Sequence, residues 1–159
     1  MSKKAKQLFK SMKWKIFLLG KFKIPMIGYT NPKLIELNDT SVKVKVKFRR
    51  RTKNHLNSMY FGALAIGADV AGGIHTFYFA QRHDQQVSFA FKGMNCEFIM
   101  RAESDCIFVS NDGKKVENAI LLSKKTGDRV NETTQVEVFN TTNELVAIFE
   151  MIVSVKCKF

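Results

Sequence analysis

Residues 58–73, SMYFGALAIGADVAGG, constrain the fold of this chain more than any other segment. Four of the six residues 62–67 are glycine or alanine, and the only charge in the segment is Asp69. An apolar helix with so little side-chain bulk lets neighbouring elements approach its backbone closely. Gly72 and Gly73 are typical of a helix end, so we expect the helix to stop there. The segment predicts a helix buried at the centre of a domain, with other elements wrapped around it.

Alternating sequences on both sides of this helix predict a sheet. Residues 41–51, SVKVKVKFRRR, place three valines and Phe48 on one face and basic side chains on the other. This pattern indicates a half-buried strand with a wet, basic outer face. Residues 32–39 are a shorter strand candidate. Further segments rich in Phe, Ile and Val are also strand candidates: 87–92, 95–110, 129–140 and 144–159.

Three other segments complete the predicted order of elements. Residues 3–19 carry apolar side chains at helical spacing, with lysines between them, so we predict an amphipathic helix. Residues 23–32 hold both prolines and are predicted to be a connector. Residues 113–126 show a second amphipathic pattern that ends at Gly127. The order is helix, two strands, a long buried helix, then four strands with one helix inserted among them, which indicates an α+β domain with an antiparallel sheet.

The positive charge of the chain is concentrated in its first third. The 159 residues include 26 Lys or Arg and 14 Asp or Glu, which gives a net charge of +12. Residues 1–53 hold 16 of these basic residues and only Glu36 and Asp39 as acids, so this part alone carries +14. The asymmetry indicates an anionic partner or a solvated basic face. The apolar run 16–20 ends at Lys21 and is too short for a signal peptide, so we expect the N-terminus to be retained.

Cysteine and histidine usage gives no sign of a disulfide framework or a metal site. Cys96, Cys106 and Cys157 leave one thiol unpaired under any scheme, which fits a reducing compartment and predicts a cytoplasmic protein. The three histidines show no ligand spacing with these cysteines, so we expect no metal and no other cofactor. No continuous run approaches the roughly 18 apolar residues of a transmembrane helix, so we expect no membrane span.

The spacing around the central helix resembles a known family. In the hotdog-fold acyl-CoA thioesterases of the phenylacetate-pathway type, a motif runs from an Asn to an Asp on the central helix, and Asn54 and Asp69 have the same offset. Gly62 falls on the second glycine of the family's glycine pair. Phe98 and Ala102 fill the places of a Phe-x-x-x-Ala bend further on. The chain is most similar to a thioesterase-like branch that has an extra helix before the last strands.

The resemblance implies a fold and a domain plan. The fold is a hotdog fold, an antiparallel sheet of about five to six strands wrapped around a central helix, with an extra N-terminal helix and a helix before the last two strands. We expect a basic amphipathic helix at residues 1–24 and a single hotdog domain at residues 25–159. Two central helices pair across a dimer in this family, so the resemblance also implies a homodimer or a dimer of dimers.

The resemblance further implies chemistry at an acyl thioester. Asp69 would activate water as a general base, or attack as a nucleophile. The backbone N–H groups of Phe61 and Gly62 would polarise the carbonyl, and Asn54 would add a donor or hold the loop. Ser88, aligned with one inserted residue, would orient the water. Since Asp69 lies roughly 10 Å along the helix from those N–H groups, the resemblance implies that Asp69 of one subunit faces Asn54 and Phe61 of the other.

Departures from the motif leave two hypotheses open. Tyr60 stands where the family has His, and Phe61 stands where it has the first Gly. The chain is therefore either a thioester hydrolase or a non-catalytic hotdog domain that binds an acyl ligand or serves as a partner module. Asp69 is correspondingly either catalytic or a buried structural acid paired with an Arg or a backbone donor. Tyr60 is a candidate wall residue of the substrate pocket under both hypotheses.

The basic stretches allow several partners. The Lys-rich segment 3–23, with Trp14, Phe17 and Phe22, would lie on an anionic membrane or is a solvated face. No nucleic-acid recognition motif is present, so we do not expect nucleic acid as a partner. Four cationic side chains just before the motif would hold the phosphates of coenzyme A, or an acidic acyl carrier protein: Arg49, Arg50, Arg51 and Lys53.

Overall fold

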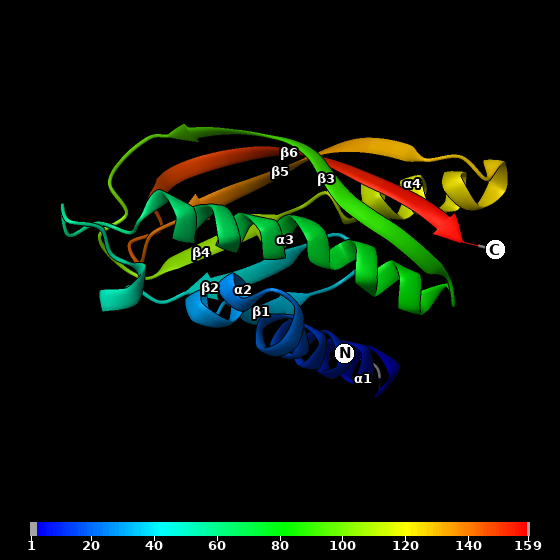
Figure 1. Cartoon of the computed structure of the whole chain (residues 1–159), viewed down its shortest axis with the longest axis horizontal. Coiled ribbons are helices and arrows are strands. Elements are labelled where there is room, and N and C mark those ends of the chain that lie inside the picture. Colours follow the sequence, from blue (N-terminus) through cyan, green and yellow to red (C-terminus); the bar gives the residue numbers. More distant parts are fainter. Residues whose placement is uncertain (1–2, 159) are drawn as a thin grey trace.

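The protein folds around one sheet and one long helix (Figure 1). In the computed structural model, which describes residues 3–158, six strands form a single antiparallel sheet in the order β1-β2-β4-β5-β6-β3. The strands are β1 Lys33–Leu37, β2 Val42–Val46, β3 Gln86–Phe98, β4 Cys106–Ser110, β5 Val130–Phe139 and β6 Leu145–Lys158. The helices are α1 Lys3–Leu18, η1 Leu19–Lys23, α2 Pro25–Thr30, η2 Arg50–Thr52, α3 Phe61–Arg82 and α4 Gly113–Thr126. The predicted α+β class and the predicted order of helices and strands are confirmed.

The small residues of α3 allow the sheet to pack directly on its backbone. A Cβ atom added at Gly67 would lie 2.4 Å from the ring of Phe108 on β4, so the ring occupies the place of a side chain. By length and composition α3 could span a bilayer, but 78% of its most apolar stretch is buried inside the protein. The helix is therefore the core of the domain, as its sequence predicted.

The prediction that the central helix ends at Gly72 and Gly73 is wrong, because α3 continues to Arg82. A Cβ atom at Gly72 would lie 3.1 Å from the sulfur of Met151, and one at Gly73 would lie 3.1 Å from the ring of Phe89. The two glycines make room for side chains of the sheet. Glycine inside a helix costs about 1 kcal/mol relative to alanine, and the close packing here offsets that cost.

The predicted connector at residues 23–32 is also wrong, because most of it is helical. The π-helical turn η1 follows α1 directly, and α2 begins one residue later with Pro25 in its first turn. Proline fits the first turn of a helix, where no N–H bond is needed. Asn31 ends α2 in a left-handed conformation, with φ of 56°.

The hairpin of α1, η1 and α2 is held by backbone contact. A Cβ atom at Gly28 would lie 2.4 Å from the carbonyl oxygen of Gly20, so both positions need glycine for this close approach. Met12 and Ile16 of α1, together with Ile27 of α2, are buried and belong to the same apolar cluster as the sheet and α3. The N-terminal helix therefore covers part of the domain core.

The long strand β3 forms one edge of the sheet. It pairs with β6 from Gln86 to Phe98, and its other side faces no strand within the described residues. The predicted strand 95–110 is split, because its first part belongs to β3 and its last part is β4. In the link between them, the carbonyl of Ala102 accepts a hydrogen bond of 2.7 Å from the N–H of Met59, which ties the link to the start of α3.

Candidate functional site

Asp69 lines a cavity between α3, the N-terminal hairpin and β3. The cavity has a volume of about 330 Å³, and among the described residues Asp69 is the only charged side chain in its wall. The other wall residues are almost all apolar: Ile16, Leu19, Ile24, Ile27, Val70, Gly73, Ile74, Phe77, Phe89, Ala90 and Phe91. A space of this kind suits an acyl chain, with one carboxylate placed against it.

The carboxylate of Asp69 has no hydrogen bond and no ion pair with any residue that the structure describes. The side chain is partly buried, and this burial raises the pKa of Asp69 above its usual value. A buried charge without a partner is costly to a fold. A structural acid is expected to pair with an Arg or a backbone donor, and Asp69 has no such pairing within residues 3–158.

Asn54, Phe61 and Gly62 lie together at the N-terminal end of α3, away from Asp69. Asn54 and Phe61 line a more open pocket of about 380 Å³ with Phe98, Met100 and Arg101. The amide oxygen of Asn54 accepts hydrogen bonds from the N–H of Leu56 at 2.9 Å and of Ser58 at 3.1 Å, so Asn54 holds its own loop. The N–H groups of Phe61 and Gly62 have no acceptor among the described residues, as expected for the first turn of a helix.

Tyr60 covers the start of α3. A Cβ atom at Gly62 would lie 2.5 Å from the Tyr60 ring, so a larger residue at this position would displace the ring from its present place. The Tyr60 and Phe61 rings also contact each other, with centroids 4.7 Å apart, and both side chains are about half exposed. Together they form an exposed aromatic pair at the start of α3.

Within one chain, the structure does not bring Asp69 to the other predicted site residues. Asp69 lies eight residues along α3 from Phe61, which corresponds to about 12 Å of helix rise. The cavity at Asp69 and the pocket at Asn54 share no lining residue. The separation matches the sequence-based estimate.

Ser88 lies on the face of β3 that points away from Asp69. It is paired with the exposed Lys156, whereas its neighbour Phe89 lines the Asp69 cavity. Successive residues of a strand point to opposite faces. Ser88 accepts a hydrogen bond of 3.1 Å from Arg129. Within one chain the structure therefore does not place Ser88 where it could orient a water molecule for Asp69.

The predicted phosphate-binding residues separate into two groups. Arg49 and Arg51 line a small pocket of about 70 Å³ with Lys33 and Lys47, at the end of α2. Lys53 instead places its ammonium group 4.2 Å from the Phe48 ring centroid and 3.0 Å from Asn57. Arg50 lies in η2 and does not line the small pocket.

Two sets of residues in these sites were missed by the sequence interpretation. Lys33 and Lys47 lie outside the Arg49–Lys53 run, and only the alternation of residues 41–51 indicated that Lys47 faces solvent. The apolar wall of the Asp69 cavity that comes from α1, η1 and α2 is not predicted by the sequence, because the two prolines of residues 23–32 indicate a connector there. No three His, Cys, Asp or Glu side chains form a metal-binding group in the described part of the chain.

An antiparallel sheet packed around one long central helix defines a hotdog fold, and solved structures support this class. A protein of unknown function from Chlorobaculum tepidum has a TM-score of 0.81 at 11% identity, covering 96% of both chains. A candidate thioesterase from Shewanella oneidensis has a TM-score of 0.79 at 11% identity, covering 92% of this chain and 99% of that one. A thioesterase from Haemophilus influenzae has a TM-score of 0.67 at 9% identity, covering 91% and 90%.

These identities are low, so the likeness to solved structures shows the fold. The fold is the thioesterase-like hotdog fold, as the motif predicted. The sequence comparison is more specific: residues 13–155 match the family described as a domain of unknown function, DUF4442, and the chain belongs to that family. No curated protein matches the sequence.

Proposed function

We propose that this protein hydrolyses acyl thioesters, with Asp69 as the general base that activates water. The observation that carries the proposal is the carboxylate of Asp69, which lines an apolar cavity and has no partner within residues 3–158. Burial moves the pKa of Asp69 upward, toward the range in which a carboxylate accepts a proton efficiently near neutral pH. The water oxygen bonds to the carbonyl carbon, the carbon–sulfur bond breaks, and the water's proton passes through Asp69 to the departing thiolate. The products are a carboxylic acid and a free thiol.

A second copy of the chain completes the site in this proposal. The outer edge of β3 pairs with no strand of residues 3–158, and exposed apolar side chains lie along it or just beyond it, including Met94, Phe98, Ile99 and Met100. An exposed edge of this length is suited to pairing with another strand. Antiparallel pairing of two β3 strands centred near Met94 would place Ala90, beside Asp69, opposite Phe98 of the second copy, beside that copy's Phe61.

The carbonyl oxygen would then be held by the helix start of the second copy. The N–H groups of Phe61 and Gly62 have no acceptor among the described residues, and the N-terminus of α3 favours developing negative charge. Asn54 contributes indirectly, because its amide oxygen is used within its own loop. Asn54 is therefore a positioning residue for the helix start.

The substrate in this proposal carries phosphate, as coenzyme A and the arm of an acyl carrier protein do. Four cationic side chains surround the small pocket at the end of α2: Lys33, Lys47, Arg49 and Arg51. None of these four has an ion pair with an acid in residues 3–158. The residue after Arg51 is also bound to the start of α3, because the carbonyl of Thr52 accepts a hydrogen bond of 2.8 Å from the N–H of Tyr60. Phosphate binding there would orient the carrier beside the helix start.

Mixed dimers provide the test of this two-chain site. Asp69→Asn removes the base, and Gly62→Val crowds the oxyanion donors against Tyr60. Each variant alone is expected to release thiol from acyl-CoA at least about a hundredfold more slowly than the wild type. Mixing the two by unfolding and refolding gives heterodimers with one intact site, so part of the activity returns. Mixing Asp69→Asn with Asp69→Ala is the matched control and restores none. Absence of restoration, with heterodimers verified by mass, would contradict the two-chain site.

Ligand binding without turnover is the second candidate function. Tyr60 and Phe61 close over the helix start, where the resembled family has His and Gly, and they narrow the approach to the N–H groups. Under this reading the protein binds acyl-CoA, but releases no thiol at any chain length. Equilibrium binding of a non-hydrolysable acyl-CoA thioether, compared with thiol release from the thioester, distinguishes the two functions.

A further inference from the structure

The exposed side of α1, η1 and α2, here called the N-terminal face, combines large apolar side chains with lysines. Lys10, Lys13, Trp14, Phe17 and Lys21 recur at three- and four-residue intervals, so they form one stripe along the helix that points away from the core. The opposite stripe contains the buried Met12 and Ile16. The exposed stripe is therefore not needed to build the fold.

Aromatic and aliphatic side chains on this face are strongly exposed. Trp14 is 61% exposed, Phe22 is 65% exposed and Met26 is 57% exposed. Phe17, Ile24 and Tyr29 are also exposed, at between 43% and 56%. Soluble surfaces rarely gather so many large apolar groups unless something covers them.

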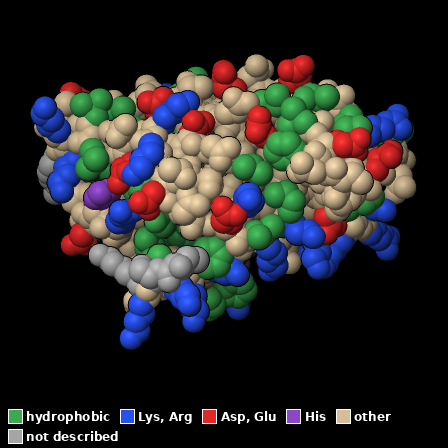
Figure 2. Space-filling model, turned by 180° about the vertical axis from the view of Figure 1, so that it is seen from behind, with side chains coloured by type: hydrophobic (Ala, Val, Ile, Leu, Met, Phe, Trp, Pro, Cys, Tyr) green, Lys and Arg blue, Asp and Glu red, His purple; other side chains and the backbone are tan. Residues whose placement is uncertain are grey.

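The charge of this region selects what can cover it. Residues 1–35 contain nine lysines and no acidic residue. Two copies of the face would repel each other, whereas an anionic surface would be attracted. Figure 2, seen from behind, shows many Lys and Arg side chains along the lower edge of the molecule, whereas acidic and basic side chains are mixed over its upper and middle parts.

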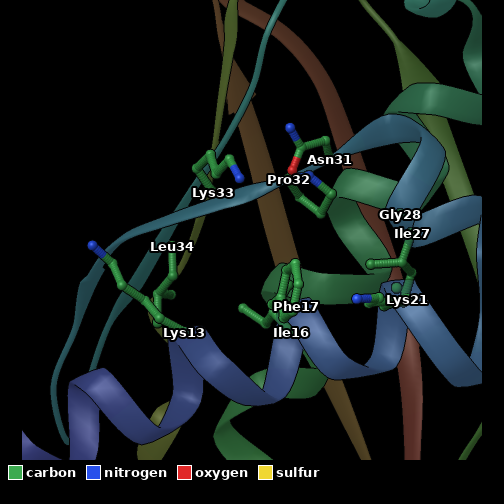
Figure 3. Close-up of a pocket in the computed structure, with 11 residues that line it drawn as sticks. Lys13, Ile16, Phe17, Lys21, Ile27, Gly28, Asn31, Pro32, Lys33 and Leu34 are labelled. Carbon is green, nitrogen blue, oxygen red and sulfur yellow. The ribbon is translucent and has the colours of Figure 1, made fainter.

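A groove on this face offers a place for an anionic head group. It has a volume of about 420 Å³ between α1, η1, α2 and the start of β1. Lys13, Lys21 and Lys33 surround it, and the apolar residues Ile16 and Phe17 lie between them (Figure 3). Cationic groups around an apolar floor match the junction between a lipid head group and its acyl chain.

We propose that the N-terminal face docks on an anionic lipid bilayer. Trp14, Phe17 and Phe22 enter the interface, and the lysines contact the lipid phosphates. Docking brings the Asp69 cavity close to the lipid, because Ile16 and Ile27 line both the groove and that cavity. Only the delivery of an acyl chain to Asp69 rests on the proposed hydrolysis. Docking itself is measured without any thioester, so the two proposals can fail separately.

Trp14 is the only tryptophan of the chain and reports directly on docking. The full-length protein is mixed with vesicles of phosphatidylglycerol and phosphatidylcholine, or of phosphatidylcholine alone. We expect a blue shift of Trp14 emission and co-sedimentation with the anionic vesicles only. Both effects should weaken as salt rises, because salt screens exposed charges. Equal binding to both kinds of vesicle, or to neither, would overturn the proposal.

Two charge-reversal pairs separate this face from general electrostatic attraction. Lys13→Glu with Lys21→Glu is expected to weaken binding to anionic vesicles at least about tenfold. Lys124→Glu with Lys125→Glu makes the same charge change on the exposed side of α4 and should leave binding almost unchanged. Phe22→Ser keeps all charges and should reduce the Trp14 blue shift. Circular dichroism and thermal unfolding confirm that each variant is folded.

Two results would contradict docking of this face on lipid. One is equal loss of binding in the two charge-reversal pairs, which would indicate attraction by net charge alone. The other is a Trp14 blue shift that grows with protein concentration in the absence of lipid, which would indicate that a second copy covers the face.

Discussion

The two halves of α3 differ in whether the acidic side chains on or beside them have hydrogen-bond and ion-pair partners. In the C-terminal half, the hydroxyl of Tyr78 donates to Asp39 at 2.7 Å, and Arg82 forms an ion pair with the same carboxylate. His83, the residue that follows α3, contacts Glu117 of α4 at 2.9 Å, and Lys114 forms an ion pair with the second oxygen of Glu117 at 2.8 Å. In the N-terminal half, Asp69 has no such partner among the described residues.

The difference shows in the direction of the pKa shifts. Hydrogen bonds from Arg82 and then Tyr78 lower the pKa of Asp39. Burial alone would raise the pKa of Glu117, but hydrogen bonds from Lys114 and His83 outweigh it and lower the pKa. Burial raises the pKa of Asp69 without opposition. Asp39 and Glu117, which support this fold, are both paired with side chains at the C-terminal end of α3, so Asp69, which has no partner among residues 3–158, points to a task other than support.

Removal of a paired acid should have the largest effect on stability. Glu117→Ala leaves His83 and Lys114 without their acceptor, and we expect the free energy of unfolding to fall by about 2 kcal/mol at pH 7. Because the pKa of Glu117 is lowered by folding, its contribution is present above its unfolded pKa and is lost as pH falls through the folded pKa. Urea unfolding at neutral and acidic pH measures both effects. Glu103→Ala, at an exposed acid, is the control and should change little. Equal losses in the two variants would contradict this account of Glu117.

Removal of the unpaired acid should have the opposite sign. Asp69→Asn deletes a partly buried charge, and we expect the free energy of unfolding to rise by about 1 kcal/mol at pH 7. Because folding raises the pKa of Asp69, the native state of the wild type loses stability as pH rises through that pKa. The advantage of the variant should therefore shrink on acidification. A variant less stable than the wild type at pH 7 would mean that Asp69 has a structural partner.

The exposed pair of the C-terminal half should matter least. The Arg82 and Asp39 side chains are each 38% exposed, and ion pairs in water contribute little. We expect Arg82→Gln to lower the free energy of unfolding by about 0.5 kcal/mol, since Tyr78 still donates to Asp39. Thermal unfolding at low and high salt checks this value. A loss several times larger would show that Arg82 fixes Tyr78 and Asp39 in the core.

Local patterns in the sequence correctly predicted those helices and strands in which apolar or small residues recur at one regular spacing. The alternation of residues 41–51 predicted β2 and its buried valines, and the small residues before Asp69 predicted the buried helix. Gly127 ends α4 as predicted, with φ of 77°. In these places propensity, periodicity and packing all favour the same structure.

The features that the sequence did not predict depend on contacts between segments that are far apart in the chain. Gly72 and Gly73 indicate a helix end when they are considered alone, but Met151 and Phe89 pack on them inside α3. The helical turn of α2 depends on backbone contact between Gly20 and Gly28. Ser88 was aligned with one inserted residue, and a one-residue shift turns a strand position to the opposite face.

The role of Asp69 in turnover is tested most directly by thiol release from a panel of short to long acyl-CoAs. Wild-type protein and Asp69→Asn are compared after both are shown to be folded and in the same oligomeric state. We predict that the wild type releases thiol with at least one chain length. The variant should be slower by about a hundredfold or more, and the wild-type rate should fall as pH decreases through the raised pKa of Asp69. No thiol release at any chain length, or equal rates for the two proteins, would contradict the proposed function.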